Sequence, residues 1–132
     1  MDSHLQTVLV VEDDAVFRTA LRIALTGMEC HVLTAADPDA AYALLTSRPV
    51  DRVLLDIRLP TMSGLSLYLT IVYRWPQLEG RIALMTGHAD APDVRLWLGL
   101  HPCTLFRKPF RFGELLTWLD ADVPARVRHA AS

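Results

Sequence analysis

Apolar residues in this chain gather into five short runs, which polar and turn-forming residues separate. The clearest run, Val53-Leu54-Leu55, has no polar alternation and stops at the carboxylate of Asp56. Runs of this kind are typical of strands that are buried on both faces of a parallel sheet. The pattern predicts strands over residues 7–11, 31–34, 52–56, 82–86 and 104–107.

Segments with helical periodicity lie between and after these runs. Asp14 is the predicted N-cap of the first helix and Gly27 its stop. Asp37 is the predicted N-cap of the second helix, with Pro38 at the first helical position. The predicted helices span about residues 15–26, 38–48, 65–75, 92–100 and 111–119.

Five strands that alternate with five helices predict an α/β fold, a doubly wound parallel sheet with helices on both faces. Right-handed crossovers then bring the carboxyl ends of all the strands to one edge of the sheet. Ligands of open parallel sheets bind in the crevice outside this edge. Residues at the strand ends are therefore the candidates for function.

Composition limits the class of protein. The 132 residues, 52% of them hydrophobic, are enough for one domain with a full core. The net charge of -2 provides no basic field, so direct binding of nucleic acid is not expected. No run reaches the roughly 18 apolar residues of a membrane helix, and residues 1–7 lack a signal-peptide core, so we expect a cytoplasmic protein without membrane attachment. Cys30 and Cys103 lack the spacing of metal ligands and are expected to be buried thiols.

Side chains that can do chemistry follow four of the five predicted strands. Glu12 and Asp13 follow the first, Asp56 ends the third, Thr86 ends the fourth and Lys108 follows the fifth. Converging carboxylates repel one another, and a few hard oxygen ligands beside a phosphate site suit Mg²⁺. The ammonium and the hydroxyl can hold oxygens of a phosphoryl group, with Asp56 as the nucleophile that forms an aspartyl phosphate. A structural salt bridge among strand-end charges is the alternative.

Four motifs together resemble the receiver domain of two-component response regulators. The resemblance covers about residues 6–120 and implies a flavodoxin-like sheet with the strand order 2-1-3-4-5. The motifs are Val10-Val11-Glu12-Asp13-Asp14, Leu54-Leu55-Asp56-Ile57-Arg58-Leu59-Pro60 with Met62-Ser63-Gly64, Met85-Thr86-Gly87-His88, and Lys108-Pro109-Phe110.

The resemblance implies a role for each matching residue. Asp56 is similar to the phosphoacceptor, Thr86 to the switch hydroxyl that moves toward the phosphoryl group, and Lys108 to the ammonium that contacts it. The bond between Lys108 and Pro109 is implied to be cis. The implied magnesium ligands are Asp13, Asp56, the backbone carbonyl of Arg58 and, largely through water, Glu12.

The sequence departs from the family pattern at the switch and beside the acceptor. Leu105 stands where the family usually has an aromatic switch residue, and strand alternation points the adjacent Phe106 to the other face of the sheet. Arg58 and His88 lie two positions after the acceptor and the switch threonine, where side chains in the family flank the path of water and of the phosphodonor. We expect these two residues to tune dephosphorylation, and a solvated arginine with a surface histidine is the alternative.

The predicted helix over residues 92–100 has more apolar positions than one buried stripe needs. Exposed apolar surface tends to mark a partner site, although extra burial in the core is the alternative. We predict a contact surface, which could serve a homodimer, on the fourth helix, fifth strand and fifth helix. Trp97 would line this surface, and Arg95, Arg107 and Arg111 would rim it.

These expectations describe a phosphorylation-dependent signalling domain, not an enzyme that acts on a separate substrate. Its expected cofactor is Mg²⁺, and its expected partners are a sensor histidine kinase or histidine phosphotransfer protein and a downstream effector protein or fused output domain. Residues 1–122 form the predicted receiver domain, and 123–132 form a short tail or the start of a linker. The alternatives are a receiver within a longer regulator, a small aspartyl-phosphate phosphatase, and a degenerate receiver that only binds protein. Arg58 stands where such a phosphatase usually has a second acid, which argues against turnover.

Overall fold

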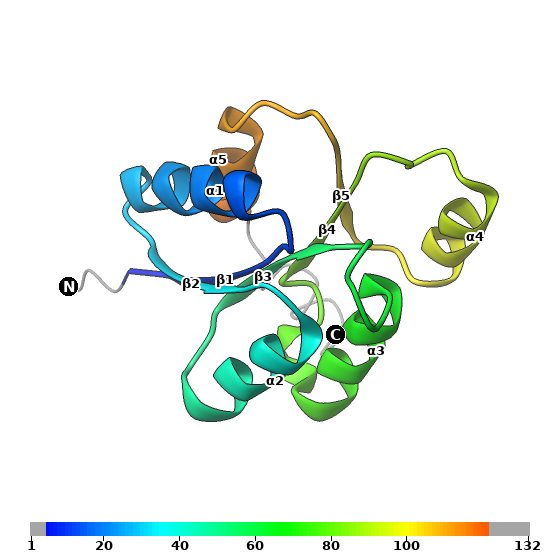
Figure 1. Cartoon of the computed structure of the whole chain (residues 1–132), viewed down its shortest axis with the longest axis horizontal. Helices are drawn as coiled ribbons and strands as arrows, with labels where there is room; N and C mark the ends of the chain where they lie inside the picture. The colour runs from blue at the N-terminus through cyan, green and yellow to red at the C-terminus, as the bar shows by residue number, and fades with distance from the viewer. Residues whose placement is uncertain (1–4, 122–132) are drawn as a thin grey trace, which may run out of the picture.

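The computed structural model describes residues 5–121, and Figure 1 shows their arrangement. The predicted tail over residues 123–132 lies outside the described residues. Five parallel strands form one sheet in the order β2-β1-β3-β4-β5, which confirms the predicted doubly wound fold and its strand order. The strands are β1 (Thr7–Val11), β2 (His31–Ala35), β3 (Arg52–Asp56), β4 (Ile82–Thr86) and β5 (Thr104–Arg107).

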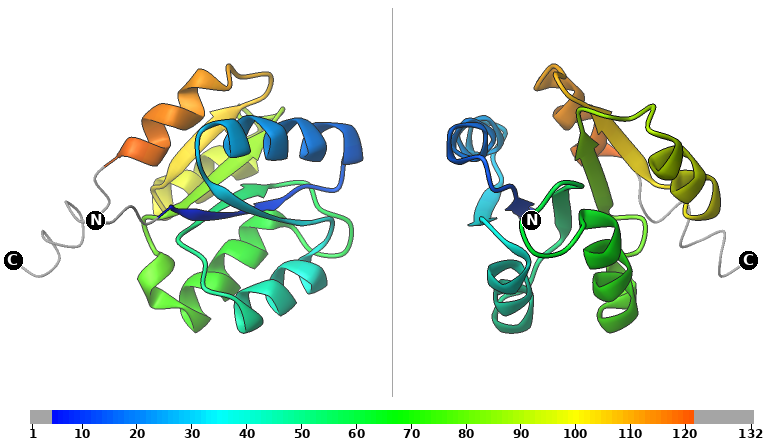
Figure 2. Two further views of the ribbon diagram at one scale, coloured as in Figure 1. Left: turned by 90° about the vertical axis from the view of Figure 1, so that its left-hand side faces the viewer. Right: turned by 45° about the vertical axis from the view of Figure 1, so that its right-hand side comes forward.

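Helices cover both faces of this sheet. In Figures 1 and 2, α1 and α5 lie on one face, α2 and α3 lie on the other, and α4 lies beside the β4–β5 side of the sheet. Among residues 5–121, none of the helices has both the length and the apolar character that a membrane crossing requires. The helices are α1 (Ala15–Gly27), α2 (Pro38–Ser47), α3 (Gly64–Arg74), α4 (Pro92–Leu100) and α5 (Gly113–Asp120), with a 3₁₀ turn η1 (Pro76–Leu78) after α3.

Side-chain caps fix the starts of α1 and α2 as predicted. The carboxylate of Asp14 accepts the backbone N–H groups of the first turn of α1, and Asp37 accepts that of Ala40. The helix α1 ends one residue later than predicted, because Gly27 is itself the last helical residue. The left-handed conformation after the helix falls on Glu29, with φ of 64°.

The core has two layers because successive residues of a strand point to opposite faces. On β1, Leu9 and Val11 pack in the layer beneath α2 and α3, whereas Val8 and Val10 pack in the layer beneath α1 and α5. All five residues of β3 and of β4 are buried. This burial explains the unbroken apolar runs and leaves the central strand ends as fixed supports for the residues that follow them.

A buried arginine connects the amino-terminal end of the central strand β3 to α5. Arg52, only 3% exposed, donates hydrogen bonds to the side-chain oxygen of Gln6 (2.6 Å) and to the backbone oxygens of Leu119 (3.3 Å) and Ala121 (3.0 Å). Its guanidinium also lies 5.2 Å from the ring centroid of Trp118. These contacts hold the carboxyl-terminal end of α5 against the start of β3.

Candidate functional site

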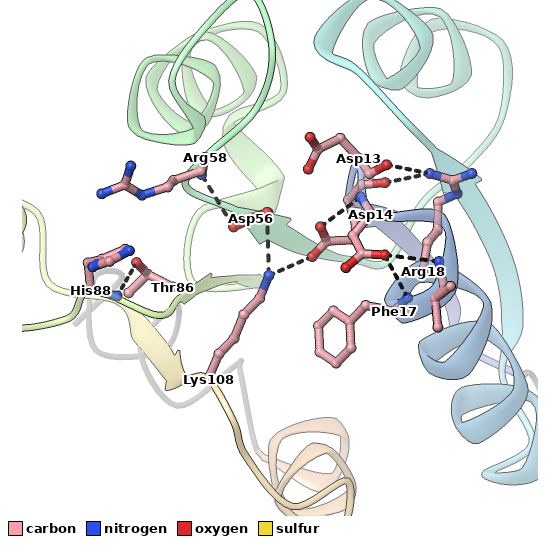
Figure 3. Close-up of polar contacts among 11 residues, drawn as sticks. Asp13, Asp14, Phe17, Arg18, Asp56, Arg58, Thr86, His88 and Lys108 are labelled. Atoms are coloured by element: carbon pink, nitrogen blue, oxygen red, sulfur yellow. Dashed lines mark hydrogen bonds and ion pairs between the residues drawn. The ribbon is translucent and has the colours of Figure 1, made fainter.

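The parallel register brings the predicted reactive residues to one edge of the sheet. Val11 of β1 pairs with Leu55 of β3, so Glu12 and Asp13 emerge beside Asp56. Thr86 ends the neighbouring strand β4, and Lys108 follows β5. Figure 3 shows Asp13, Asp56, Thr86 and Lys108 around a common space, although they come from four strands.

Three carboxylates meet at this edge. Glu12, Asp13 and Asp56 each offer an oxygen that lies within 4.8 Å of those of the other two. Glu12 and Asp56 are buried, at 1% and 4% exposure, whereas Asp13 is exposed. The cluster is therefore supported by protein on one side and open to solvent on the other.

Lys108 reaches this cluster from β5. Its Nζ lies 2.8 Å from Oε1 of Glu12 and 3.4 Å from Oδ2 of Asp56. Figure 3 marks the contact between Lys108 and Asp56 with a dashed line. Burial of the ammonium acts against its charged form, but the hydrogen bond to Glu12 and the charges of Asp56 and Glu12 outweigh it, so the pKa of Lys108 lies above its usual value. The ammonium therefore stays charged where it faces Asp56.

Glu12 has the most perturbed carboxyl group among these residues. Burial raises its pKa from 4.5 to about 7, against the lowering effect of the hydrogen bonds from Lys108 and from the backbone of Asp14. The negative charge of Asp56 adds to the increase. A positive charge bound beside Glu12 would favour its ionised form.

The donor set fits Mg²⁺. Hard carboxylate oxygens from few residues, on a rim that leaves room for water and phosphate oxygens, are the ligands that this ion prefers. With all three carboxylates ionised, the ammonium of Lys108 balances one of three negative charges, and a divalent cation would neutralise the remainder. Arg58, whose backbone carbonyl was predicted as a further ligand, directly follows Ile57 in the loop after β3.

Backbone contacts hold Asp56 in place. The N–H of Arg58 donates to Oδ1 of Asp56 at 3.2 Å, which leaves Oδ2 on the side of Lys108. The loop after β3 closes where the N–H of Gly64 donates to the oxygen of Ile57 at 2.7 Å. Gly64 is buried so tightly that a Cβ there would lie 2.9 Å from the carbonyl carbon of Asp56.

Thr86 is buried at the end of β4 with its hydroxyl at the site. Its Oγ1 accepts the backbone N–H of His88 at 2.9 Å, and its carbonyl accepts the backbone N–H of Lys108 at 2.8 Å. Because the Thr86 oxygen is the acceptor in the first bond, its O–H can still donate to a group near Asp56. The Lys108–Pro109 bond is cis, as the resemblance implied.

The residue at the expected aromatic position contacts a different layer from its neighbour. Leu105 is partly buried in the layer with α2 and α3, and Phe106 is buried in the layer with α1 and α5. The alternation that the sequence predicted is therefore present. Position 105 carries no aromatic ring, as the sequence showed.

The family model of the response regulator receiver domain matches residues 8–120. The chain belongs to this family. As a receiver domain it is a phosphoacceptor of two-component signal transduction, and neither the phosphatase nor the degenerate alternative is favoured. The matched residues cover all five helices and, apart from Thr7, all five strands that the structure describes.

Relatives of this receiver domain include longer regulators. The hydrogenase transcriptional regulatory protein HoxA of Cupriavidus necator is 37% identical over 94 residues, which are 71% of this chain and 19% of the relative. The transcriptional regulatory protein AruR of Pseudomonas aeruginosa is 37% identical over 128 residues, 93% of this chain and 51% of the relative. The chain thus spans about half, or less, of the length of these curated relatives.

Solved structures have the same fold. A receiver domain protein (CheY-like) from Methanospirillum hungatei superposes with a TM-score of 0.83 at 20% identity, covering 96% of this chain and 99% of that one. The response regulator TrrA from Thermotoga maritima, crystallised in complex with Mg²⁺ and BeF, is 26% identical with a TM-score of 0.75, and the match covers 87% of this chain and 96% of that one.

Two site residues of the receiver domain had not been singled out from the sequence. Arg18 donates from Nη1 to the backbone oxygen of Glu12 at 2.8 Å and so fixes the loop that carries the acids. The ring centroid of Phe17 lies 4.8 Å from Nζ of Lys108. Both residues lie one turn after the N-cap Asp14. This position next to the acidic loop is the sequence feature that could have indicated their contact with the site.

The predicted contact surface is only partly as expected. Arg95 and Arg111 are exposed, and Leu96 and Leu100 of α4 are exposed at 69% and 71%. Trp97, however, is half-buried and packs edge-on against Tyr68 of α3, with ring centroids 5.1 Å apart. Arg107 pairs through both terminal nitrogens with Asp90 in the loop after β4.

Proposed function

We propose that this receiver domain, in the cytoplasm, takes a phosphoryl group onto Asp56 from a phosphohistidine of a sensor histidine kinase or histidine phosphotransfer protein. The observation that carries the proposal is the position of the ammonium of Lys108, 3.4 Å from Oδ2 of Asp56, beside the carboxylates of Glu12 and Asp13. A nucleophile, a fixed cation and a metal-binding acidic cluster meet at this point, as phosphoryl transfer requires.

In the reaction, a carboxylate oxygen of Asp56 attacks phosphorus and the bond from phosphorus to the donor nitrogen breaks. The imidazole keeps the bonding electrons and takes up a proton. Lys108 faces the incoming oxygens with its charge already close to Asp56, so it stabilises the transition state with little rearrangement. Asp13, Asp56, the carbonyl of Arg58 and, through water, Glu12 would hold Mg²⁺, which supplies charge neutralisation for the phosphoryl oxygens.

Thr86 converts the phosphorylated state into a change of shape. A phosphoryl group on Asp56 carries about two negative charges in place of the single charge of the carboxylate, and it attracts the hydroxyl of Thr86 and the ammonium of Lys108. The loop after Thr86 leads into α4, which packs on the core through the buried Val94 and the partly buried Trp97 and Leu98. The opposite side of α4 is exposed, so the helix can shift with the loop while the fully buried central strands stay fixed. Since Leu105 occupies the aromatic position, this movement is carried by Thr86 and its loop.

Arg58 and His88 tune the lifetime of the phosphorylated state. Both are exposed, and with Thr86 and Asp93 they line a cleft of about 470 Å³ between the loops that follow β3 and β4. The guanidinium of Arg58 can pair with a phosphoryl group on Asp56 or obstruct the water that would remove it. Either effect slows dephosphorylation.

The output of the switch is a change in partner binding. The exposed Leu96 and Leu100, with Arg95 and Arg111 nearby, support a contact surface on α4, β5 and α5 for a second copy or an effector protein. Relatives that are about twice as long as this chain, or longer, support an output domain as the alternative recipient of the signal.

Intact mass after incubation with acetyl phosphate and Mg²⁺ tests the proposal. Wild type is expected to gain one phosphoryl group, and Asp56→Asn is expected to gain none. Equal labelling of both proteins would exclude Asp56 as the acceptor. Continuous release of phosphate from small phosphomonoesters would instead identify a phosphatase.

A further inference from the structure

The side chain of Lys108 has partners of two chemical kinds. Glu12 and Asp56 provide negative charge on one side, at 2.8 and 3.4 Å from Nζ. On another side lies the aromatic ring of Phe17, whose centroid is 4.8 Å from the same nitrogen. Figure 3 shows this ring beside the ammonium, between Lys108 and the first turn of α1. A four-carbon side chain that is a quarter exposed has other rotamers available, so neighbours of this kind decide where its charge is held.

Phe17 is itself well fixed. Its backbone N–H donates to Oδ1 of the N-cap Asp14, so it belongs to the anchored first turn of α1. Its ring packs against Phe110 at a centroid distance of 5.9 Å, edge to face, and against Phe112 at 6.2 Å. Phe110 lies two residues after Lys108, so Phe17 contacts both the ammonium and the backbone segment that carries it.

An aromatic ring at this distance attracts an ammonium through its quadrupole. The ring also occupies the space on that side of Lys108 with apolar atoms, so the ammonium cannot move there. The two effects limit Lys108 to positions between the ring and the acidic cluster. When Asp56 gains a phosphoryl group, the ammonium needs only a short movement toward the new oxygens. Pre-organisation of a charged group in this way lowers the barrier because less ordering is left for the transition state.

We propose that Phe17 is a positioning residue for phosphoryl transfer, which holds the ammonium of Lys108 in reach of the group transferred to Asp56. This role rests on the proposed function of Asp56 and Lys108. Phe17 does not touch the reacting atoms and acts through the lysine.

Three substitutions separate positioning from general packing. Phe17→Leu removes the ring and keeps an apolar side chain, Phe17→Tyr keeps the ring, and Phe112→Leu removes one of the rings that pack on Phe17. Each is made in wild type and in Lys108→Met, with folding checked by thermal melting. The initial rate of phosphorylation by acetyl phosphate with Mg²⁺ is measured by intact mass, and the ¹H shifts of the Lys108 Hε protons are measured by NMR without phosphodonor.

The expected result is a rate about five-fold lower for Phe17→Leu, the size of a cation–π contact at a half-buried site. Phe17→Tyr and Phe112→Leu are expected to stay within about two-fold of wild type, and Phe17→Leu is expected to have no effect in Lys108→Met. The ring-current shift of the Lys108 protons is expected to disappear in Phe17→Leu alone.

Three results would overturn the role of Phe17: an unchanged rate in Phe17→Leu, the same loss in the presence and absence of Lys108, or a loss in Phe17→Tyr equal to that in Phe17→Leu. A wild type that gains no phosphoryl group refutes the proposed function and the role of Phe17 with it. A wild type that is phosphorylated while Phe17→Leu reacts equally fast refutes the role of Phe17 alone.

Discussion

We expect Glu12 to make the affinity of the receiver domain for Mg²⁺ depend on pH in the neutral range. Burial raises the pKa of its carboxyl to about 7, and the protonated form cannot contribute its charge to the metal site. A group with this pKa is about one-eleventh ionised at pH 6 and ten-elevenths ionised at pH 8. We therefore expect Mg²⁺ to bind about ten-fold more tightly at pH 8 than at pH 6.

The same shift affects stability in the metal-free protein. Because the folded pKa of Glu12 is raised from 4.5 to about 7, its contribution favours folding below pH 4.5 and is lost as pH rises through 7. At about 1.36 kcal/mol per pKa unit, Glu12 lowers the free energy of unfolding by about 3 kcal/mol between these limits. Bound Mg²⁺ is expected to offset this loss.

Calorimetric titration with Mg²⁺ at pH 6 and pH 8 measures the effect, and Glu12→Gln is the matched control without a titrating group. Wild type should show the ten-fold difference in affinity, and Glu12→Gln should show a much smaller one. Equal affinities of wild type at the two pH values would refute the assignment of a protonated, buried Glu12 to the metal site.

Three further substitutions test other parts of the account. Gly64→Ala places a Cβ 2.9 Å from the carbonyl carbon of Asp56, so we expect a displacement of the acceptor that slows phosphorylation by about 100-fold, whereas Gly99→Ala, with open space around it, should be neutral; equal rates would contradict the close packing. Arg52→Ala should lower the free energy of unfolding in urea by about 2–4 kcal/mol through lost packing and hydrogen bonds, and a loss below about 0.5 kcal/mol would show that the α5 contacts contribute little. Arg58→Ala should lose its phosphoryl group several-fold faster than wild type, and an unchanged half-life would remove the tuning role.

The strands were the most predictable part of the structure. Strands β1, β3, β4 and β5 have the predicted bounds because their apolar runs are flanked by charge, glycine or proline, and β2 runs one residue past its predicted end. The strand order came from the family resemblance, since periodicity alone does not tell which strands are neighbours. Helix ends were less predictable: α5 begins at Gly113, two residues after the predicted start, because Arg111 and Phe112 form the turn that precedes it.

Some site residues could also be predicted from the sequence, and others could not. Residues at strand ends, such as Asp56 and Lys108, could be placed from the sequence because parallel strands share one edge. Contacts through side chains could not: the pairing of Arg107 with Asp90 depends on two loops that only the folded chain brings together. The contact of Phe17 with Lys108 likewise joins residues that are 91 positions apart in the chain, which a local pattern does not reveal.

Chemical trapping of the phosphorylated residue tests the central claim most directly. Borohydride reduces an aspartyl phosphate to homoserine, and peptide mass spectrometry then locates the modified position. After treatment with acetyl phosphate and Mg²⁺, we predict homoserine at position 56 in wild type and none in Asp56→Asn. Homoserine at position 13, or none in a protein that has gained a phosphoryl group, would contradict the account.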